Sequence, residues 1–126
     1  MKLLLDTHLL LWAAADRLPL SARVLIADPA NALLFSAASI WEIAIKGSFG
    51  RPDFLADASV IWRGLVDNGY EHLPVTAAHG AAVMRLPAVH RDPFDRLLVA
   101  QAMVEGITLL TADARLGAYP GPVRVV

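Results

Sequence analysis

The most constraining feature of the sequence is a run of three leucines, Leu3–Leu5, that ends at the carboxylate of Asp6. An apolar run without polar alternation is typical of a strand that is covered on both faces, as in the middle of a parallel sheet. Ligands of open α/β sheets bind in the crevice beyond the carboxyl ends of the strands. We therefore expect Asp6 at a ligand-binding edge, although an aspartate here can also be the N-cap of a helix that begins near His8.

Length and composition limit the architecture to one domain, residues 1–126, with a single core. Hydrophobic residues make up 56% of the chain, more than a domain of this size can bury, which predicts an apolar interface with a second copy or a partner protein. The net charge of −1 provides no global attraction for nucleic acid, so such binding requires local basic residues or a metal. The absence of cysteine excludes disulfides and thiolate metal sites.

The N-terminus combines Lys2 with apolar runs, as signal peptides do, but Asp6 and His8 interrupt the apolar segment. We interpret it as part of the mature protein. No apolar stretch approaches the roughly 18 residues of a membrane span. We therefore expect no membrane association and a cytoplasmic protein.

Strands and helices alternate along the chain, which predicts an α/β fold on a parallel sheet. The expected strands cover residues 2–5, 32–35, 70–74, 107–110 and 123–126. The expected helices cover residues 8–15, 22–27, 36–46, 54–68, 76–85 and 93–104. Ser21 is the expected cap of the second helix, and Gly47 is expected to end the third.

Four acidic residues occupy comparable places in this pattern. Asp6 and Asp113 follow strands, whereas Glu42 and Asp95 lie in helices that follow loops. In a parallel sheet these places share one rim. Crowded carboxylates cannot all stay ionised unless a cation joins them, and oxygen donors favour Mg²⁺ or Mn²⁺. Such a site can activate water and support an in-line displacement at phosphorus.

Each of these acids also has a local structural explanation. Asp92 before Pro93 is a typical N-cap, and Asp95 then lies at the third helical position, where an acid complements the helix dipole. Asp113 can cap the short turn at 114–116.

Glu42 has an alternative role in a capping box with Ser39. The preceding strand instead favours Ser36 as the cap, which places Glu42 in the second turn. Lys46 follows Glu42 by one turn, and an i,i+4 pair of this kind contributes about 0.3 kcal/mol.

Four segments in this order resemble the PIN domain family, and within it the VapC-like toxin ribonucleases of toxin–antitoxin pairs. They are residues 3–8 (LLLDTH), 39–43 (SIWEI), 92–100 (DPFDRLLVA) and 110–113 (LTAD). The third segment is distinctive by itself. The first and last are weak signals alone and support the resemblance only because all four segments occur in this order. The similarity runs from Lys2 to Val126.

The resemblance implies a three-layer α/β/α sandwich around a parallel sheet of about five strands. It also implies a homodimer that acts as an endoribonuclease with Mg²⁺, or alternatively Mn²⁺, and that a cognate antitoxin protein inhibits. RNA would be the substrate. The acids implied in catalysis and metal binding are Asp6, Glu42, Asp95 and Asp113.

Further roles follow from the same resemblance. Thr7 would orient Asp6 or hold a metal-bound water, and Asp92 is either a fifth acid or only the helix cap. The candidates for contacts with RNA phosphates are Arg96, Lys46, Arg51 and Arg91. The candidate interface anchors, each also expected to be partly in the core, are Trp12, Trp41 and Trp62.

Other functions fit the sequence less well. A haloacid-dehalogenase phosphatase normally carries a second aspartate two positions after the first, where this chain has His8. A response-regulator receiver domain expects adjacent early acids and a late lysine at a strand end, neither of which is present. The main alternative is a catalytically silent PIN fold that serves as an RNA-binding or assembly module, and metal-dependent RNA cleavage distinguishes the two.

Overall fold

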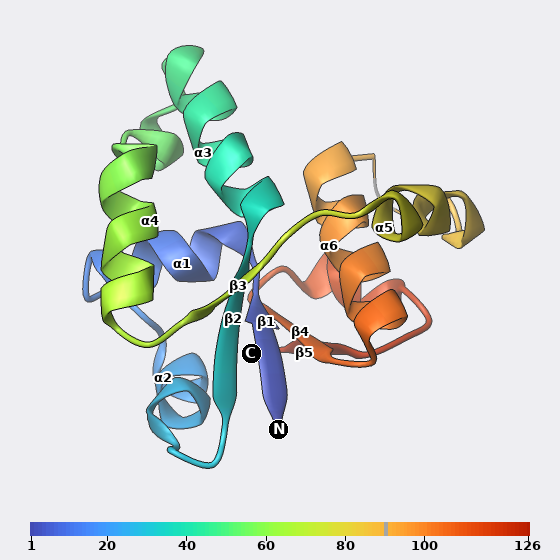
Figure 1. Ribbon diagram of the computed structural model, residues 1–126, viewed down its shortest axis with the longest axis horizontal. Helices are drawn as coiled ribbons and strands as arrows, with labels where there is room; N and C mark the ends of the chain where they lie inside the picture. Colours follow the sequence, from blue (N-terminus) through green and yellow to red (C-terminus); the bar gives the residue numbers. More distant parts are fainter. Residues whose placement is uncertain (90) are drawn as a thin grey trace.

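Five short parallel strands form the central layer of the computed structural model, which describes residues 1–89 and 91–126 (Figure 1). In spatial order they are β3 (Glu71–Leu73), β2 (Ala32–Ser36), β1 (Lys2–Leu5), β4 (Thr108–Thr111) and β5 (Val123–Val125). Every neighbouring pair is parallel. The expected parallel sheet is therefore confirmed, with β1 at its centre and β3 and β5 at its edges.

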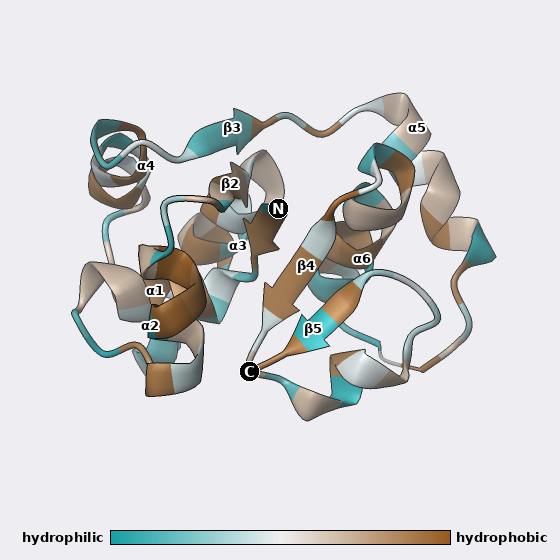
Figure 2. Ribbon diagram, turned by 90° about the horizontal axis from the view of Figure 1, so that it is seen from below, coloured by the Kyte–Doolittle hydropathy of each residue, from teal (hydrophilic) through white to brown (hydrophobic). Residues whose placement is uncertain are grey.

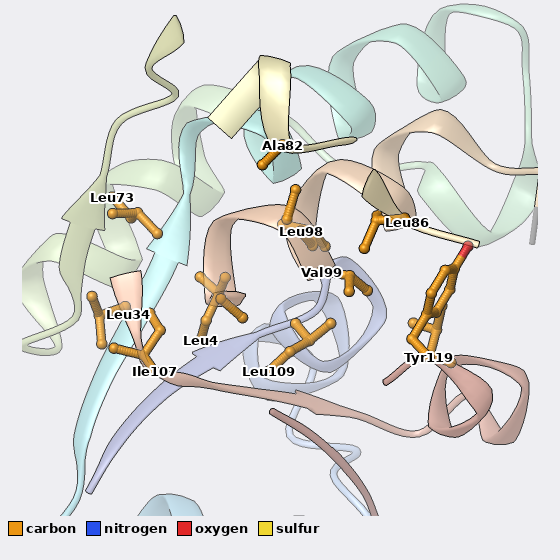
Figure 3. Close-up of a cluster of buried hydrophobic side chains, with 13 residues drawn as sticks. Leu4, Leu34, Leu73, Ala82, Leu86, Leu98, Val99, Ile107, Leu109 and Tyr119 are labelled. Atoms are coloured by element: carbon orange, nitrogen blue, oxygen red, sulfur yellow. The ribbon is translucent and has the colours of Figure 1, made fainter. Parts of the chain in front are cut away.

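The central strand β1 is covered on both faces. Leu4 packs in a cluster with Leu98 and Val99 on one side of the sheet (Figure 3). Leu3 and Leu5 belong to a second cluster on the other side. All three leucines of β1 are completely buried, which explains why the strand carries no polar alternation.

Helices cover the two faces of the sheet, as Figure 2 shows from below. They are α1 (Thr7–Ala14), α2 (Leu20–Ala27), α3 (Ala37–Ser48), α4 (Ala58–Asp67), α5 (Ala77–Ala82) and α6 (Pro93–Glu105), with 3₁₀ turns η1 (Pro52–Phe54), η2 (Val83–Arg85) and η3 (Ala114–Ala118). Helices α1, α2 and α4 pack on one face, and α5 and α6 pack on the other. This confirms the three-layer α/β/α sandwich. In the described ranges, none of the helices combines the length and apolar character needed to cross a membrane.

The helices that carry acidic candidates begin and end as local chemistry dictates. The Ser36 hydroxyl accepts a hydrogen bond from the Ala38 amide at 3.0 Å, so Ser36 rather than Ser39 caps α3. Asp92 caps α6 with Pro93 in its first turn. Helix α6 ends at Gly106, whose φ of 67° lies in the left-handed region that favours glycine.

The expected boundaries of α2 and α3 are wrong. Helix α2 begins at Leu20 with Pro19 at the N-cap and without a side-chain cap, so Ser21 does not have the expected role. Helix α3 continues through Gly47 to Ser48. A Cβ atom on Gly47 would lie 2.9 Å from the Phe54 carbonyl oxygen. Glycine is therefore present because η1 packs closely on the helix and not because the helix stops.

The expected helix over residues 54–68 is shorter than predicted. Phe54 is completely buried, but it lies in η1. Helix α4 begins only at Ala58, where the Asp57 carboxylate accepts hydrogen bonds from the Ser59 and Val60 amides. The apolar pattern included Phe54 because a buried 3₁₀ turn and the first turn of a helix have similar spacing.

A polar chain that is buried except at Glu105 joins the start of α3 to α5 and α6. The Ser36 hydroxyl donates to Gln101 Oε1 at 2.5 Å, and both residues are completely buried. Gln101 Nε2 lies 3.4 Å from His79 Nδ1, and His79 Nε2 lies 2.8 Å from Glu105 Oε2. Since buried polar groups are costly without partners, this chain fixes the start of α3 against α6.

Candidate functional site

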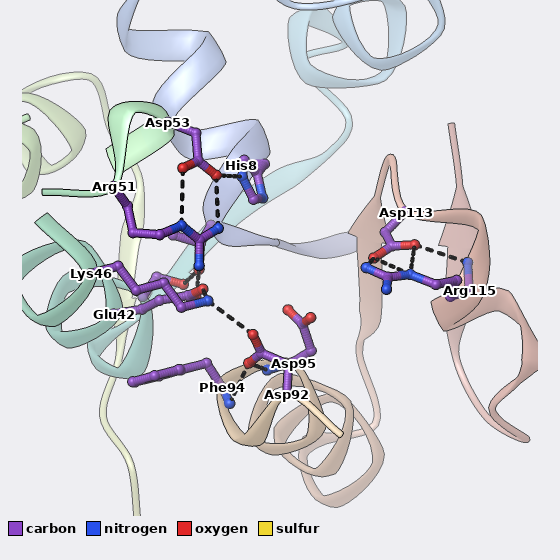
Figure 4. A network of polar contacts seen from close by, with 12 residues as sticks. His8, Glu42, Lys46, Arg51, Asp53, Asp92, Phe94, Asp95, Asp113 and Arg115 are labelled. Carbon is purple, nitrogen blue, oxygen red and sulfur yellow. Dashed lines mark hydrogen bonds and ion pairs between the residues drawn. The ribbon is translucent and has the colours of Figure 1, made fainter. Parts of the chain in front are cut away.

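A cavity of about 240 Å³ lies beyond the carboxyl ends of the strands (Figure 4). Acidic residues from separate elements line it: Asp6 after β1, Glu42 in α3, Asp92 and Asp95 at the start of α6, and Asp113 after β4. The other lining residues are His8, Lys46, Arg51 and Arg115. The structure therefore brings the four acids predicted from the sequence, together with Asp92, around one space.

Asp6 is held at the inner end of this cavity and is only 5% exposed. One carboxylate oxygen accepts a hydrogen bond from the Leu9 amide at 2.9 Å, so Asp6 also caps α1. The other oxygen accepts a short hydrogen bond from the Thr111 hydroxyl. Burial raises the pKa of Asp6 above its ordinary value, an effect that these hydrogen bonds only partly offset and that the charge of Glu42 reinforces.

Glu42 is 2% exposed and uses both carboxylate oxygens. Oε1 accepts from the Thr7 hydroxyl at 2.5 Å, and Oε2 accepts from the Lys46 ammonium at 2.5 Å. The Thr7 hydroxyl also lies 2.9 Å from Ser39 Oγ. Thr7 was expected to orient Asp6 or to hold a metal-bound water. In the structure its hydroxyl contacts Glu42 in place of Asp6, and the role at a metal-bound water stays a prediction.

The Lys46 ammonium bridges two acids. Besides Glu42, it donates to Asp92 Oδ2 at 2.9 Å, while Asp92 Oδ1 accepts from the Phe94 and Asp95 amides. Burial alone would lower the pKa of Lys46, but the two carboxylates outweigh it and raise this pKa. Burial would raise the pKa of Asp92, but the Lys46 hydrogen bond and the backbone amides lower it. Asp92 is therefore both the helix cap and a partner of Lys46.

Asp95 and Asp113 also line the cavity, and they come from different elements. Asp95 is partly buried at the third position of α6, with its carboxylate beside that of Asp92 in Figure 4. Asp113 caps η3 and forms an ion pair with the exposed Arg115, with Oδ2 at 2.7 Å from the guanidinium. The cap roles of Asp6, Asp92 and Asp113 thus coexist with their placement at the cavity.

The four basic residues proposed to contact RNA have different positions. Arg51 lines the cavity and pairs with Asp53 at 3.1 Å, and Arg91 is exposed. Lys46 is engaged with carboxylates, as described. The Arg96 guanidinium instead donates to the carbonyl oxygens of residues 83, 86 and 87. Arg96 is therefore a tie between segments and does not line the cavity.

Three residues at the site were not predicted. Thr111 is buried and joins Asp6 to the Asp113 amide, which donates to its hydroxyl at 3.0 Å. Arg115 and His8 line the cavity. The sequence offered one weak signal for Thr111, namely a hydroxyl residue two positions before Asp113 at the end of a strand. The signal is weak because threonine is common in strands.

The donor set fits a hard divalent cation, since carboxylate oxygens from five acids line the cavity. Within residues 1–89 and 91–126, however, no three histidine, aspartate or glutamate side chains are gathered as a group that could hold one ion. The Lys46 ammonium holds one oxygen each of Glu42 and Asp92. A divalent cation at Glu42 or Asp92 would therefore meet oxygens that Lys46 already contacts.

Comparison with known proteins identifies the family. The PIN domain model matches residues 3–122. Ribonuclease VapC22 from Mycobacterium tuberculosis is 32% identical and aligns over 97% of this chain and 96% of that protein.

Solved structures share the fold at low sequence identity. VapBC2 from Rickettsia felis bound to a promoter DNA fragment has a TM-score of 0.74 at 15% identity, covering 100% of this chain and 99% of that one. DNA-bound VapBC from Salmonella typhimurium has a TM-score of 0.69 at 14% identity, covering 100% and 97%. The chain therefore belongs to the PIN domain family.

Proposed function

We propose that this protein is a divalent-metal-dependent endoribonuclease and the toxin of a toxin–antitoxin pair. The observation that carries the proposal is the convergence of five acids on one cavity at the carboxyl edge of the sheet. The similarity to Ribonuclease VapC22 supports ribonuclease chemistry, and the VapBC complexes among the structural neighbours support an antitoxin partner.

Asp6, Glu42, Asp95 and Asp113 would hold Mg²⁺ or Mn²⁺. The ion would supply water activation and neutralise negative charge that develops at phosphorus. The protein's own contribution is to fix the ligands: Thr111 holds Asp6, and Thr7 holds Glu42. Loss of a residue that holds a metal ligand in place typically lowers metal affinity or activity by about 10- to 100-fold.

RNA phosphates would approach the basic side of the cavity. Arg51 and Arg115 line it and are both largely exposed, and Arg91 is exposed near the start of α6. These contacts would position the sugar–phosphate backbone of the RNA without recognising its base sequence. A negative chain net charge is compatible with this, because the basic residues are local to the cavity.

Asp95→Asn tests the proposed role of Asp95 as a metal ligand. We expect at least about 100-fold less RNA cleavage, because a direct ligand should matter at least as much as a residue that only holds a ligand in place. Without metal, the free energy of unfolding should change by less than about 1 kcal/mol. Asp92 still caps α6, and the loss of a favourable interaction with the helix dipole opposes the gain from reduced repulsion between the acids. The measurements are cleavage of purified RNAs with Mg²⁺ or EDTA, and urea unfolding in EDTA.

Asp67→Asn, which changes an exposed acid at the end of α4, is the matched control and should cleave like the original protein. If the original protein binds RNA but yields no fragments with either metal, the silent-module alternative is correct. If Asp95→Asn instead loses several kcal/mol of stability, Asp95 has a structural role.

A separate apolar groove supports the antitoxin partner. It has a volume of about 630 Å³ and lies between α1, α2 and α4, with Leu18, Ile26, Val60, Ile61 and Leu65 in its lining. An amphipathic segment of a partner would fit a groove of this kind. Trp41 and Trp62 are also exposed and are available as anchors of a dimer face or an antitoxin interface, whereas Trp12 packs partly on the core.

We expect Val60→Asp to weaken the antitoxin complex at least about tenfold, because it places a charge in an apolar contact. Val66→Asp is the matched control, since Val66 lies on the same helix outside the groove and is 50% exposed, compared with 56% for Val60. The partner to test is the product of a small open reading frame directly upstream, measured by calorimetry with each variant. Equal weakening by both variants would contradict a docking role for the groove.

A further inference from the structure

The acidic cavity contains a cation that belongs to the protein itself. The Lys46 ammonium lies 2.5 Å from Glu42 Oε2 and 2.9 Å from Asp92 Oδ2, and its side chain is only 15% exposed. Its position is fixed by two aromatic rings as well, with Nζ at 5.0 Å from the Phe54 centroid and 5.3 Å from that of Phe94. Lys46 is therefore held inside the cavity and is not a surface side chain that happens to reach an acid.

The two acids that Lys46 contacts belong to different helices and have different roles. Glu42 is a proposed metal ligand whose second oxygen is held by Thr7. Asp92 uses its second oxygen to cap α6. The ammonium thus occupies the one remaining oxygen on each of two acids that belong to different helices, and it joins α3 to α6 across the cavity.

We propose that Lys46 is the internal counter-ion of the metal-free site and that it must release Glu42 when a divalent cation binds. This inference rests on the proposed metal-dependent function. Two cations cannot share the same carboxylate oxygen at contact distance without strong repulsion. Lys46 therefore stabilises the metal-free cavity and, by the same contacts, weakens its affinity for the metal.

The test is Mn²⁺ binding to Lys46→Met, measured from the electron paramagnetic resonance signal of free Mn²⁺. Methionine keeps an apolar side chain between the two rings and removes the charge. We expect Mn²⁺ to bind about tenfold or more tightly than to the original protein, because the competing cation is gone. In EDTA this variant should melt at a lower temperature, and adding Mn²⁺ should raise its melting temperature more than that of the original protein.

Two control variants separate this role from general effects of charge or packing. Arg51→Met removes another cation that lines the cavity, but one that is exposed and paired with Asp53, and it should change Mn²⁺ affinity by less than about threefold. Lys46→Arg keeps the charge and should bind Mn²⁺ within about threefold of the original protein. If Lys46→Met folds only when Mn²⁺ is present, the inference is supported, because Mn²⁺ then replaces the missing ammonium as the counter-ion of the acids.

Unchanged or weaker Mn²⁺ binding by Lys46→Met would overturn the inference, as would absence of Mn²⁺ binding in every variant. A gain in affinity by Lys46→Arg equal to that of Lys46→Met would also overturn it, because the charge would then not matter. Absence of Mn²⁺ binding in every variant would overturn the proposed metal-dependent function as well, whereas the other outcomes concern the role of Lys46 alone. A protein that shows the expected exchange but cleaves no RNA has the counter-ion without the nuclease activity.

Discussion

Replacement of Asp6 by asparagine should reduce RNA cleavage by at least about 100-fold while making the metal-free protein more stable at neutral pH. Asparagine keeps an oxygen for the Leu9 amide, so the cap of α1 remains. It removes a buried negative charge that lies close enough to Glu42 to be disfavoured by it. The fold no longer has to accommodate that charge, and the proposed metal site loses one of its two buried carboxylates, the other being Glu42.

The gain in stability should depend on pH with a defined sign. Burial raises the folded-state pKa of Asp6 above its ordinary value of 3.8. The favourable contribution of the protonated carboxyl is therefore complete below pH 3.8 and is lost as the pH rises through the raised pKa. The difference in free energy of unfolding between Asp6→Asn and the original protein should consequently be near zero in acid and grow toward neutral pH. Urea unfolding in EDTA across this range measures it.

Asp57→Asn is the matched control for this experiment. Asp57 also caps a helix, through the Ser59 and Val60 amides, but it is exposed and lies outside the acidic cavity. Since asparagine and aspartate are about equally good caps, this variant should show neither the pH-dependent gain nor a loss of cleavage. A loss of stability in Asp6→Asn at neutral pH would mean that the helix cap is the main role of Asp6.

The sequence was sufficient to predict the sheet and the side of it where the acids meet. The unbroken leucine run indicated a strand with two buried faces, and the parallel order followed from the alternation of strands and helices. Asp6, Glu42, Asp95 and Asp113 then had to lie at the carboxyl edge because each follows or faces a strand end. Local chemistry also distinguished Ser36 from Ser39 as the cap of α3.

The contacts of the basic residues could not be predicted in the same way. The Glu42–Lys46 pair is local and was expected from its i,i+4 spacing, but the bond from Lys46 to Asp92 joins two helices far apart in the sequence. An arginine near an acidic motif can contact either an RNA phosphate or a carbonyl oxygen of the protein. For Arg96 the outcome depends on the path of residues 83–87, which its local sequence does not indicate. The boundary at Gly47 was missed for the same reason, since the close approach of η1 has no local signal.

Arg96→Met should lower the free energy of unfolding by about 1.5–3 kcal/mol, the range for a hydrogen bond to a charged group. The guanidinium donates to the carbonyl oxygens of Pro87 at 2.9 Å, Val83 at 3.3 Å and Leu86 at 3.4 Å, and to the Tyr119 hydroxyl at 3.3 Å. These bonds hold the segment that follows α5 and the end of η3 on α6. Chemical unfolding with and without metal measures the loss.

Arg91→Met is the matched comparison because it removes the same side chain at an exposed position five residues earlier. It should change stability by less than about 0.5 kcal/mol and weaken RNA binding, with a smaller salt dependence of the affinity, since phosphate contacts release counterions. Arg96→Lys should recover only part of the stability, because an ammonium lacks the planar fork that reaches several carbonyls at once. If Arg96→Met instead unfolds like the original protein but binds RNA poorly, its guanidinium leaves the carbonyls to meet phosphate, and the assignment of Arg96 to the fold is wrong.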